Sequence, residues 1–259
     1  MAKQRGRKSA DSRRGTAREA AGDGSASLAL LWGTRARPSR GPKPQLTLDA
    51  VVRAAIEVAD ADGIDAVTMT RVAQRLDVTT MAIYRYVPRK EELVDLMNDH
   101  ALGPPPTPGG GSWRAEVARW ARTSLSRFQN RPWLLETARR RVPIGPNWLG
   151  WLDAGLRALE RSGLPSQEMI SAVMLVDGHV RATAELSSGP SATERWARDF
   201  GTVLGSVIGD PRYAALTQVA MAKGSSRMSS GSASPFEFGL ERILDGIEAR
   251  PGKRRSRRR

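Results

Sequence analysis

Apolar residues recur three and four positions apart along much of this chain, the spacing that places side chains on one face of an α-helix. The first such segment runs from about Leu48 to Asp62. Thr47 or Asp49 can cap its start, and Gly63 can end it with a positive φ. The face that is expected to be buried consists of Val51, Val52, Ala55, Ile56 and Ala59.

The stretch from Thr68 to Lys90 reads TMTRVAQRLDVTTMAIYRYVPRK and predicts two short helices joined by a tight turn. The first is expected from Met69 to Leu76, with Thr68 as its cap. The second is expected from about Thr79 to Val87, with Thr79 or Thr80 as its cap. Pro88 then ends the second helix, because proline has no amide hydrogen to donate. The small core of the pair is expected to contain Val72, Leu76, Val78, Ile83 and Val87.

The outward positions of the second helix carry hydrogen-bonding groups, a side chain suited to contact a thymine methyl group, and a cation. They are Thr80, Met81, Tyr84, Arg85 and Tyr86. A recognition helix needs these groups to read base edges in the major groove of DNA. The pattern therefore indicates a helix-turn-helix that binds double-stranded DNA.

A further helix is predicted from Arg89 to Ala101, followed by linker chemistry in GPPPTPGGGS, residues 103–112. Beyond it, proline and glycine breaks separate helices predicted at 113–129, 132–139, 147–162, 166–186, 193–208, 211–221 and 235–249. The predicted fold is all-α, with an N-terminal three-helix helix-turn-helix domain and a larger C-terminal helical domain for ligand binding and dimerisation. The domain boundaries are expected at 1–43 (disordered basic arm), 44–102 (DNA binding), 103–112 (linker), 113–250 (ligand binding and dimerisation) and 251–259 (disordered basic tail).

The positive charge of the chain lies in its two ends. The formal net charge is +14, of which residues 1–43 contribute +8 and residues 250–259 contribute +7, so residues 44–249 carry −1. Such tails are commonly solvated and bind polyanions without specificity. Arg35, Arg37, Arg40 and Lys43 directly precede the first helix, so they can also follow the phosphate backbone or enter a minor groove. The segment from Leu28 to Gly33, which ends in LLWG, interrupts the N-terminal arm as a candidate docking helix.

Composition argues against several classes of protein. The chain has no cysteine, which excludes disulfides and thiolate metal sites, and no apolar run long enough for a membrane span. Asp177, His179, Arg181 and Glu185 share one predicted helix, but residues two apart do not face each other there. We therefore expect no catalytic residues, no metal and no cofactor.

From Gly63 to Met97 the chain reads GIDAVTMTRVAQRLDVTTMAIYRYVPRKEELVDLM, and this unit resembles the DNA-binding domain of the TetR/AcrR family of transcriptional regulators. One departure is Asp77, which stands in the turn where the family usually has glycine. Asp tolerates the left-handed conformation better than most residues do, so the turn is expected to form.

The resemblance implies a role for each matching position. Tyr84 and Lys90 contact phosphate, and Thr68 and Thr70 contact the groove edge and backbone at the start of the first helix of the pair. Tyr86 contacts phosphate or sugar, with packing in the core as the alternative. The base-reading positions are Thr79, Thr80, Met81 and Arg85, and Arg71 completes the predicted DNA-binding set.

The C-terminal region resembles that of tetracycline repressors, which implies an effector pocket and a dimer interface. Eleven aromatic residues follow the linker, and the pocket is predicted at Trp120, Phe128, Trp133, Trp151, Met174 and His179, although any single tryptophan can be ordinary core. The chain has no histidine pair that matches the metal-chelated drug site of tetracycline repressors. The predicted interface residues are Met169, Val173, Phe236, Leu240, Ile243, Leu244 and Ile247, with packing inside one subunit as the alternative.

Together these features predict a cytoplasmic, nucleoid-associated bacterial regulator. It is expected to bind a palindromic operator as a homodimer, to respond to an unidentified small-molecule effector and to repress transcription. The alternative is a sequence-tolerant architectural DNA-binding protein driven by its basic tails.

Overall fold

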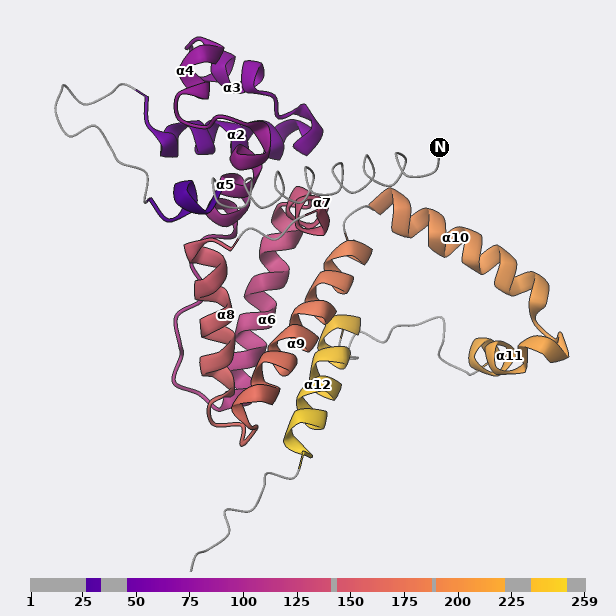
Figure 1. Cartoon of the computed structure of the whole chain (residues 1–259). Coiled ribbons are helices and arrows are strands. Elements are labelled where there is room, and N and C mark those ends of the chain that lie inside the picture. The colour runs from indigo at the N-terminus through magenta and orange to yellow at the C-terminus, as the bar shows by residue number, and fades with distance from the viewer. Residues whose placement is uncertain (1–26, 34–45, 141–143, 188–189, 222–233, 251–259) are drawn as a thin grey trace, which may run out of the picture. The chain divides into compact units, whose positions relative to one another are not determined.

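The computed structural model of the chain describes residues 27–33, 46–140, 144–187, 190–221 and 234–250 (Figure 1). The regular elements in these ranges are helices and none is a strand, which confirms the all-α prediction. The chain divides into two compact units. The first contains the described residues up to Pro106 together with Trp133–Ala154, and the second contains Thr107–Pro132 and the described residues from Gly155 onward.

The first unit is built on α2 (Leu48–Asp62), which begins where Thr47 Oγ1 accepts a hydrogen bond from Ala50 N at 3.1 Å and ends at Gly63, φ 82°. A short 3₁₀ helix, η1 (Ile64–Ala66), leads into α3 (Met69–Arg75) and α4 (Thr80–Tyr84). Both α3 and α4 are capped as predicted, by Thr68 and Thr79. Threonine caps replace the helical partners that the first amide groups lack.

The turn between α3 and α4 forms with Asp77 at φ 52°, in the left-handed region. Val78 N donates to Ala73 O at 3.0 Å and closes the turn. Of the predicted core of this pair, Val72, Ile83 and Val87 are fully buried. Leu76 and Val78 are only half-buried, because they lie at the turn itself.

The fourth helix of this unit, α5 (Lys90–Leu102), is joined at its C-terminal end to α8 (Pro146–Leu159). The buried carboxylate of Asp99 accepts hydrogen bonds from Trp148 N at 2.9 Å and from Asn147 N at 3.2 Å, so a residue of α5 caps α8. A Cβ at Gly145 would collide with this carboxylate, so only glycine allows the approach. The Trp151 indole also donates to Gly103 O at 2.8 Å.

Two further segments pack in the first unit. Helix α7 (Trp133–Arg140) contacts α5, and Thr137 Oγ1 donates to Asn98 Oδ1 at 2.5 Å. Residues 27–31 of the LLWG region form a helical turn, and Trp32 Nε1 donates to Ile144 O at 3.0 Å. The structure thus groups Trp133–Ala154 with the helix-turn-helix, whereas the sequence placed them in the second domain. The division at residues 103–112 stays a prediction.

In the second unit α6 (Trp113–Asn130), α9 (Ser166–Ser187) and α12 (Pro235–Glu248) run side by side (Figure 1). Arginines of α6 bind acids of α12. Arg122 Nη2 lies 2.7 Å from Glu237 Oε2, and Arg114 Nη2 lies 2.7 Å from Asp245 Oδ1. The aliphatic core between these helices includes Val173, Val176, Val180, Leu240 and Leu244.

The remaining elements of the second unit are α10 (Pro190–Val207), the 3₁₀ helix η2 (Pro211–Tyr213) and α11 (Ala214–Met221). Helix α10 begins at Pro190, before the predicted Thr193, since proline is favoured in the first turn of a helix. The single helix predicted at 211–221 is divided into η2 and α11. No residue of α11 is buried.

Part of the predicted linker is held by a single carboxylate. Glu116 of α6 accepts hydrogen bonds from Gly109 N at 3.1 Å and Gly111 N at 3.0 Å. Arg161 Nη2 donates to Gly111 O at 2.6 Å. The amide hydrogen bonds from Gly109 and Gly111 and the charges of Arg119 and Arg161 lower the pKa of Glu116 below its ordinary 4.5.

Replacing Asp99 by alanine should lower the free energy of unfolding by about 2 kcal/mol, because two partly buried amide groups at the start of α8 lose a charged acceptor. Chemical denaturation measures the change. Asp99→Asn keeps one acceptor oxygen and should cost less. Equal stability of Asp99→Ala and the native protein would show that the cap does not stabilise the joint.

The lowered pKa of Glu116 predicts a pH-dependent contribution to stability. A carboxylate whose pKa is lower in the folded state stabilises the fold above its unfolded pKa and loses this contribution as the pH falls. Glu116→Gln should therefore be less stable than the native protein at neutral pH, and the difference should shrink below pH 4.5. The measurement is the denaturation midpoint across pH. Glu160→Gln, at an exposed glutamate, is the matched control, and a Glu116→Gln difference that is constant with pH would contradict the assignment.

Candidate nucleic-acid interface and effector site

The recognition helix α4 is five residues long and holds to the unit through one buried side chain, Ile83. Its outer surface is formed by Met81, which is 71% exposed, and Tyr84, which is 42% exposed. Thr79 and Arg85, on either side of the helix, are exposed, and Thr80 is half-exposed. The structure therefore brings the predicted base-reading positions together on one outward surface.

The predicted contacts on α3 also face outward. Thr68, Thr70 and Arg71 are exposed, and Thr68 Oγ1 accepts a hydrogen bond from Arg71 N at 3.1 Å. The Arg71 guanidinium is bound internally, with Nη2 2.5 Å from Asp62 Oδ2 of α2. Lys90 is half-exposed at the start of α5.

Tyr86 differs from the other predicted DNA contacts. It is half-buried, and its hydroxyl donates to Leu46 O at 2.7 Å, just before α2. The partly buried ring and the internal acceptor of the hydroxyl agree with the core packing that the sequence left as the alternative, and a contact with phosphate or sugar stays a prediction. The basic positions Arg35, Arg37, Arg40 and Lys43 and the C-terminal tail lie outside the described residues.

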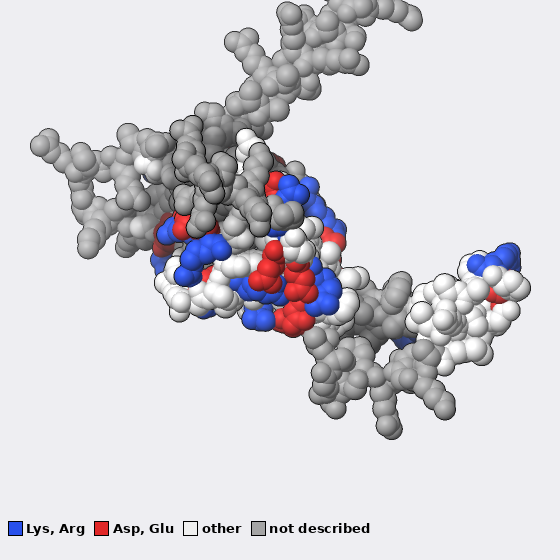
Figure 2. Space-filling view, turned by 90° about the horizontal axis from the view of Figure 1, so that it is seen from below, with Lys and Arg blue, Asp and Glu red and all other residues white. Residues whose placement is uncertain are grey.

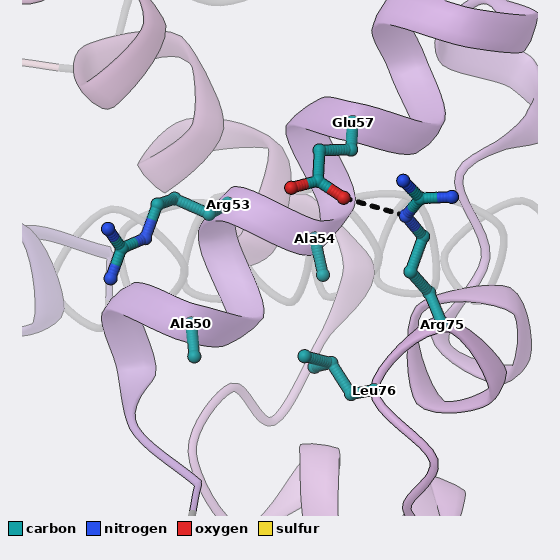
Figure 3. Close-up of a pocket in the computed structure, with 6 residues that line it drawn as sticks. All are labelled: Ala50, Arg53, Ala54, Glu57, Arg75 and Leu76. Atoms are coloured by element: carbon teal, nitrogen blue, oxygen red, sulfur yellow. Dashed lines mark hydrogen bonds and ion pairs between the residues drawn. The ribbon is translucent and has the colours of Figure 1, made fainter.

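A hollow of the first unit lies elsewhere, between α2 and the C-terminal end of α3 (Figure 3). Its volume is about 560 Å³, and it is lined by Ala50, Arg53, Ala54, Glu57, Arg75 and Leu76. Arg75 Nε binds Glu57 Oε2 at 2.7 Å across it, and Arg53 forms an ion pair with Asp49. None of the predicted DNA-contacting residues lines this hollow.

Positive and negative charges are mixed on the face drawn in Figure 2, where Lys and Arg side chains are interleaved with Asp and Glu. This agrees with the net charge of −1 over residues 44–249. Residues 44–249 therefore carry no overall excess of positive charge, and the candidate interface rests on the outward residues of α3 and α4.

The six residues predicted for an effector pocket lie in two different units. Trp133 and Trp151 belong to the first unit, where both indoles donate hydrogen bonds, Trp133 to Asp60 Oδ1 at 2.7 Å and Trp151 to Gly103 O. Trp120 and Phe128 are buried on α6 in the second unit, whereas Met174 on α9 is 46% exposed.

His179 of α9 contacts α12. Its Nε2 lies 2.9 Å from Phe236 O, and its ring stacks on the Phe236 ring with centroids 5.3 Å apart. A Cβ at Gly239 would collide with the imidazole, so this glycine lets α12 approach α9 closely. His179 thus positions α12, a role that its place in the sequence did not reveal.

The second unit encloses a small apolar cavity between α6, the end of α8 and α9. Trp120 lines it with Val117, Gly155, Leu159, Val173 and Val176, and its volume is about 10 Å³. That is room for about one water molecule. An organic ligand could enter here only if these helices moved apart.

Five of the seven residues predicted for a dimer interface are core residues of a single chain. Phe236, Leu240, Leu244 and Ile247 of α12 are buried, as is Val173 of α9, and Met169 and Ile243 are half-buried. This is the packing within one subunit that the sequence left as the alternative. The exposed large apolar side chains of the same two helices are Ile170, Met174, Leu175, Leu186 and Phe238, of which only Met174 was among the predicted site residues.

The part of the chain that the structure describes shows neither a group of metal ligands nor a helix that could span a membrane. In the described ranges no three or more His, Cys, Asp or Glu side chains are grouped to hold a metal ion. None of the described helices combines the length and apolar character that a membrane crossing requires.

Two family models match the chain. The one described as "Bacterial regulatory proteins, tetR family" matches residues 51–97, which include α3 and α4. The one described as "Tetracyclin repressor-like, C-terminal domain" matches residues 105–250.

Curated relatives and solved structures agree with these matches. The HTH-type transcriptional repressor DrrR1 of Streptomyces coeruleorubidus is 39% identical over 246 residues, which is 90% of this chain and 89% of that protein. The class A tetracycline repressor of Escherichia coli, from transposon 1721, is 26% identical over 214 residues, 80% of this chain and 92% of that protein. ActR of Streptomyces coelicolor, solved with actinorhodin, has a TM-score of 0.68 and 29% identity over 82% of this chain and 99% of its own.

The agreement extends over most of the chain and includes both the outward helix-turn-helix and the helical region that follows it. The chain therefore belongs to the TetR family of bacterial DNA-binding transcriptional regulators.

Proposed function

We propose that this protein is a ligand-responsive repressor that binds a palindromic operator as a homodimer. The observation that carries the proposal is the outward surface of α4, where Ile83 alone enters the core and Met81 and Tyr84 face solvent. The relative DrrR1 is named a transcriptional repressor, which supports repression as the direction of control. We place the protein in the bacterial cytoplasm, where its DNA is.

Base contacts are assigned to Thr79, Thr80, Met81 and Arg85, and backbone contacts to Thr68, Thr70, Arg71, Tyr84, Tyr86 and Lys90. A helix as short as α4 buries little area against DNA, so high affinity requires two copies. Two-fold related recognition helices read half-sites about 34–36 Å apart on one face of the duplex, which implies a palindromic operator.

The dimer surface is assigned to the exposed faces of α9 and α12. Ile170 and Met174 are four residues apart, and Gly178 continues their row at a position where an added Cβ would have no atom within 4 Å. Phe238 is 60% exposed on α12, which packs beside α9. A two-fold axis through this row would bury the same apolar patch on both copies.

The effector site is assigned to the helical region after residue 112. Structures of ActR with actinorhodin and with (S)-DNPA support a small-molecule effector for a chain of this fold. The cavity beside Trp120 is the site that an effector would enlarge. Because α8 runs from the Asp99 cap to Gly155 and Leu159 at this cavity, a shift of α8 would move α5.

Selection of bound sequences from random DNA tests the proposal directly. It should enrich a sequence with two-fold symmetry, and a protein that lacks residues 1–43 and 251–259 should select the same sequence. Absence of a symmetric sequence would refute the proposal. Loss of all binding together with the tails would instead support the architectural alternative.

Arg85→Ala should weaken binding to the selected sequence by about 1–3 kcal/mol, or roughly 5- to 150-fold, if Arg85 contacts a base edge. Fluorescence anisotropy with the selected and a scrambled duplex measures the loss. Arg53→Ala removes the same charge from an exposed site on α2 and is the matched control. Equal losses for the two variants would contradict a specific role for Arg85.

Met174→Glu should weaken dimerisation at least about tenfold, because it places a charge in the proposed apolar interface. Sedimentation analysis over a range of protein concentrations measures the dissociation constant. Leu149→Glu changes an exposed leucine of α8 in the first unit and should leave the dimer intact. A monomeric native protein, or an unaffected Met174→Glu dimer, would count against this surface.

A further inference from the structure

The arginines of α3 are held by acids of α2 in two successive ion pairs. Arg71 Nη2 lies 2.5 Å from Asp62 Oδ2, and Arg75 Nε lies 2.7 Å from Glu57 Oε2. Arg71 and Arg75 are four residues apart, so they share one face of α3. Figure 3 shows the second pair, with Arg75 reaching toward Glu57 across the hollow between the two helices.

The two pairs occupy different positions relative to the proposed DNA contacts. Arg71 lies in the first turn of α3, where its amide is bound by Thr68 and it follows Thr70. Arg75 is the last residue of α3 and lines the hollow that contains none of the assigned contacts. The first pair therefore involves a proposed phosphate contact, and the second does not.

The Asp62–Arg71 pair can exchange partners with DNA. Both side chains are 47% exposed, and an exposed pair of this kind is weak. A carboxylate and a phosphate offer the guanidinium the same kind of charged oxygen acceptor, with a geometry that arginine matches in both cases. Asp62 also brings a negative charge next to the position that a DNA phosphate would take.

We propose that Asp62 is a positioning residue that competes with DNA phosphate for Arg71 and thereby lowers the affinity of the protein for DNA. The inference rests on the proposed function, in which Arg71 contacts the DNA backbone. Asp62 acts on the strength of binding and not on the sequence that is read, because it faces an arginine that touches no base edge in this assignment.

The substitution that tests this is Asp62→Asn, which keeps the size of the side chain. It should not unfold the protein, since Asp62 is the last residue of α2 and a negative charge at a helix C-terminus is unfavourable. Binding to the selected duplex should become about twofold to fivefold tighter. The plot of log K against log salt concentration should become steeper by up to about one unit, because Arg71 then neutralises phosphate charge without the opposing charge of Asp62 beside it.

Two controls separate this effect from a general gain of positive charge. Glu57→Gln removes the same charge from α2 and releases Arg75, and it should change neither affinity nor salt slope. Asp62→Asn in an Arg71→Ala background should bring no gain, because the competing group has lost its arginine. The same Asp62→Asn gain on scrambled DNA is also expected, since phosphate contacts are shared by all sequences.

The inference is overturned if Asp62→Asn leaves affinity and slope unchanged, if Glu57→Gln tightens binding equally, or if the gain persists without Arg71. These outcomes are distinct from failure of the proposed function, in which the native protein would select no symmetric DNA sequence at all.

Discussion

The burial of Ile83 is the interaction on which the DNA-reading surface depends. A helix of five residues is too short to persist alone in water, so α4 exists because its one buried side chain and its Thr79 cap hold it to the unit. The cap satisfies an amide that the short helix cannot satisfy itself. Because Ile83 is the one buried side chain of α4, the exposed side chains of this helix are available to contact DNA, and packing in the core does not restrict their type.

The joint between α5 and α8 is a second constraint of a different kind. It is polar and buried, with the Asp99 carboxylate bound by amides of α8 and the Trp151 indole bound by the backbone after α5. Buried polar groups must be paired, so this joint tolerates little change in the relative position of the two helices. The joint connects α8 to α5, the helix that follows the recognition helix. A shift of α8 caused by an effector would have to pass through this joint to reach α5.

The distribution of charge determines which arginines can strengthen binding to DNA. Arg71 and Arg75 of α3 are already paired with acids of α2, and Arg114 and Arg122 of α6 are paired with acids of α12. The described surface therefore carries compensated charge, while the uncompensated charge of the chain lies at its two ends. Specificity is assigned to the outward residues of α4, and strength of binding depends on which arginines remain available to phosphate.

The sequence by itself determined most of the helices, the threonine caps of α2, α3 and α4, and the helix-turn-helix, because these follow from local patterns such as Thr68, Thr79 and the spacing of Val72, Ile83 and Val87. It also predicted the left-handed turn at Asp77. It did not reveal that Trp133 and Trp151 belong to the first unit, or that Phe236, Leu240, Leu244 and Ile247 are core rather than exposed interface. An apolar stripe shows that a helix face is buried but not what covers it. What covers an apolar face depends on contacts between different helices, and only the tertiary structure decides it. The same holds for the pairing of Asp62 with Arg71 and the capping of α8 by Asp99.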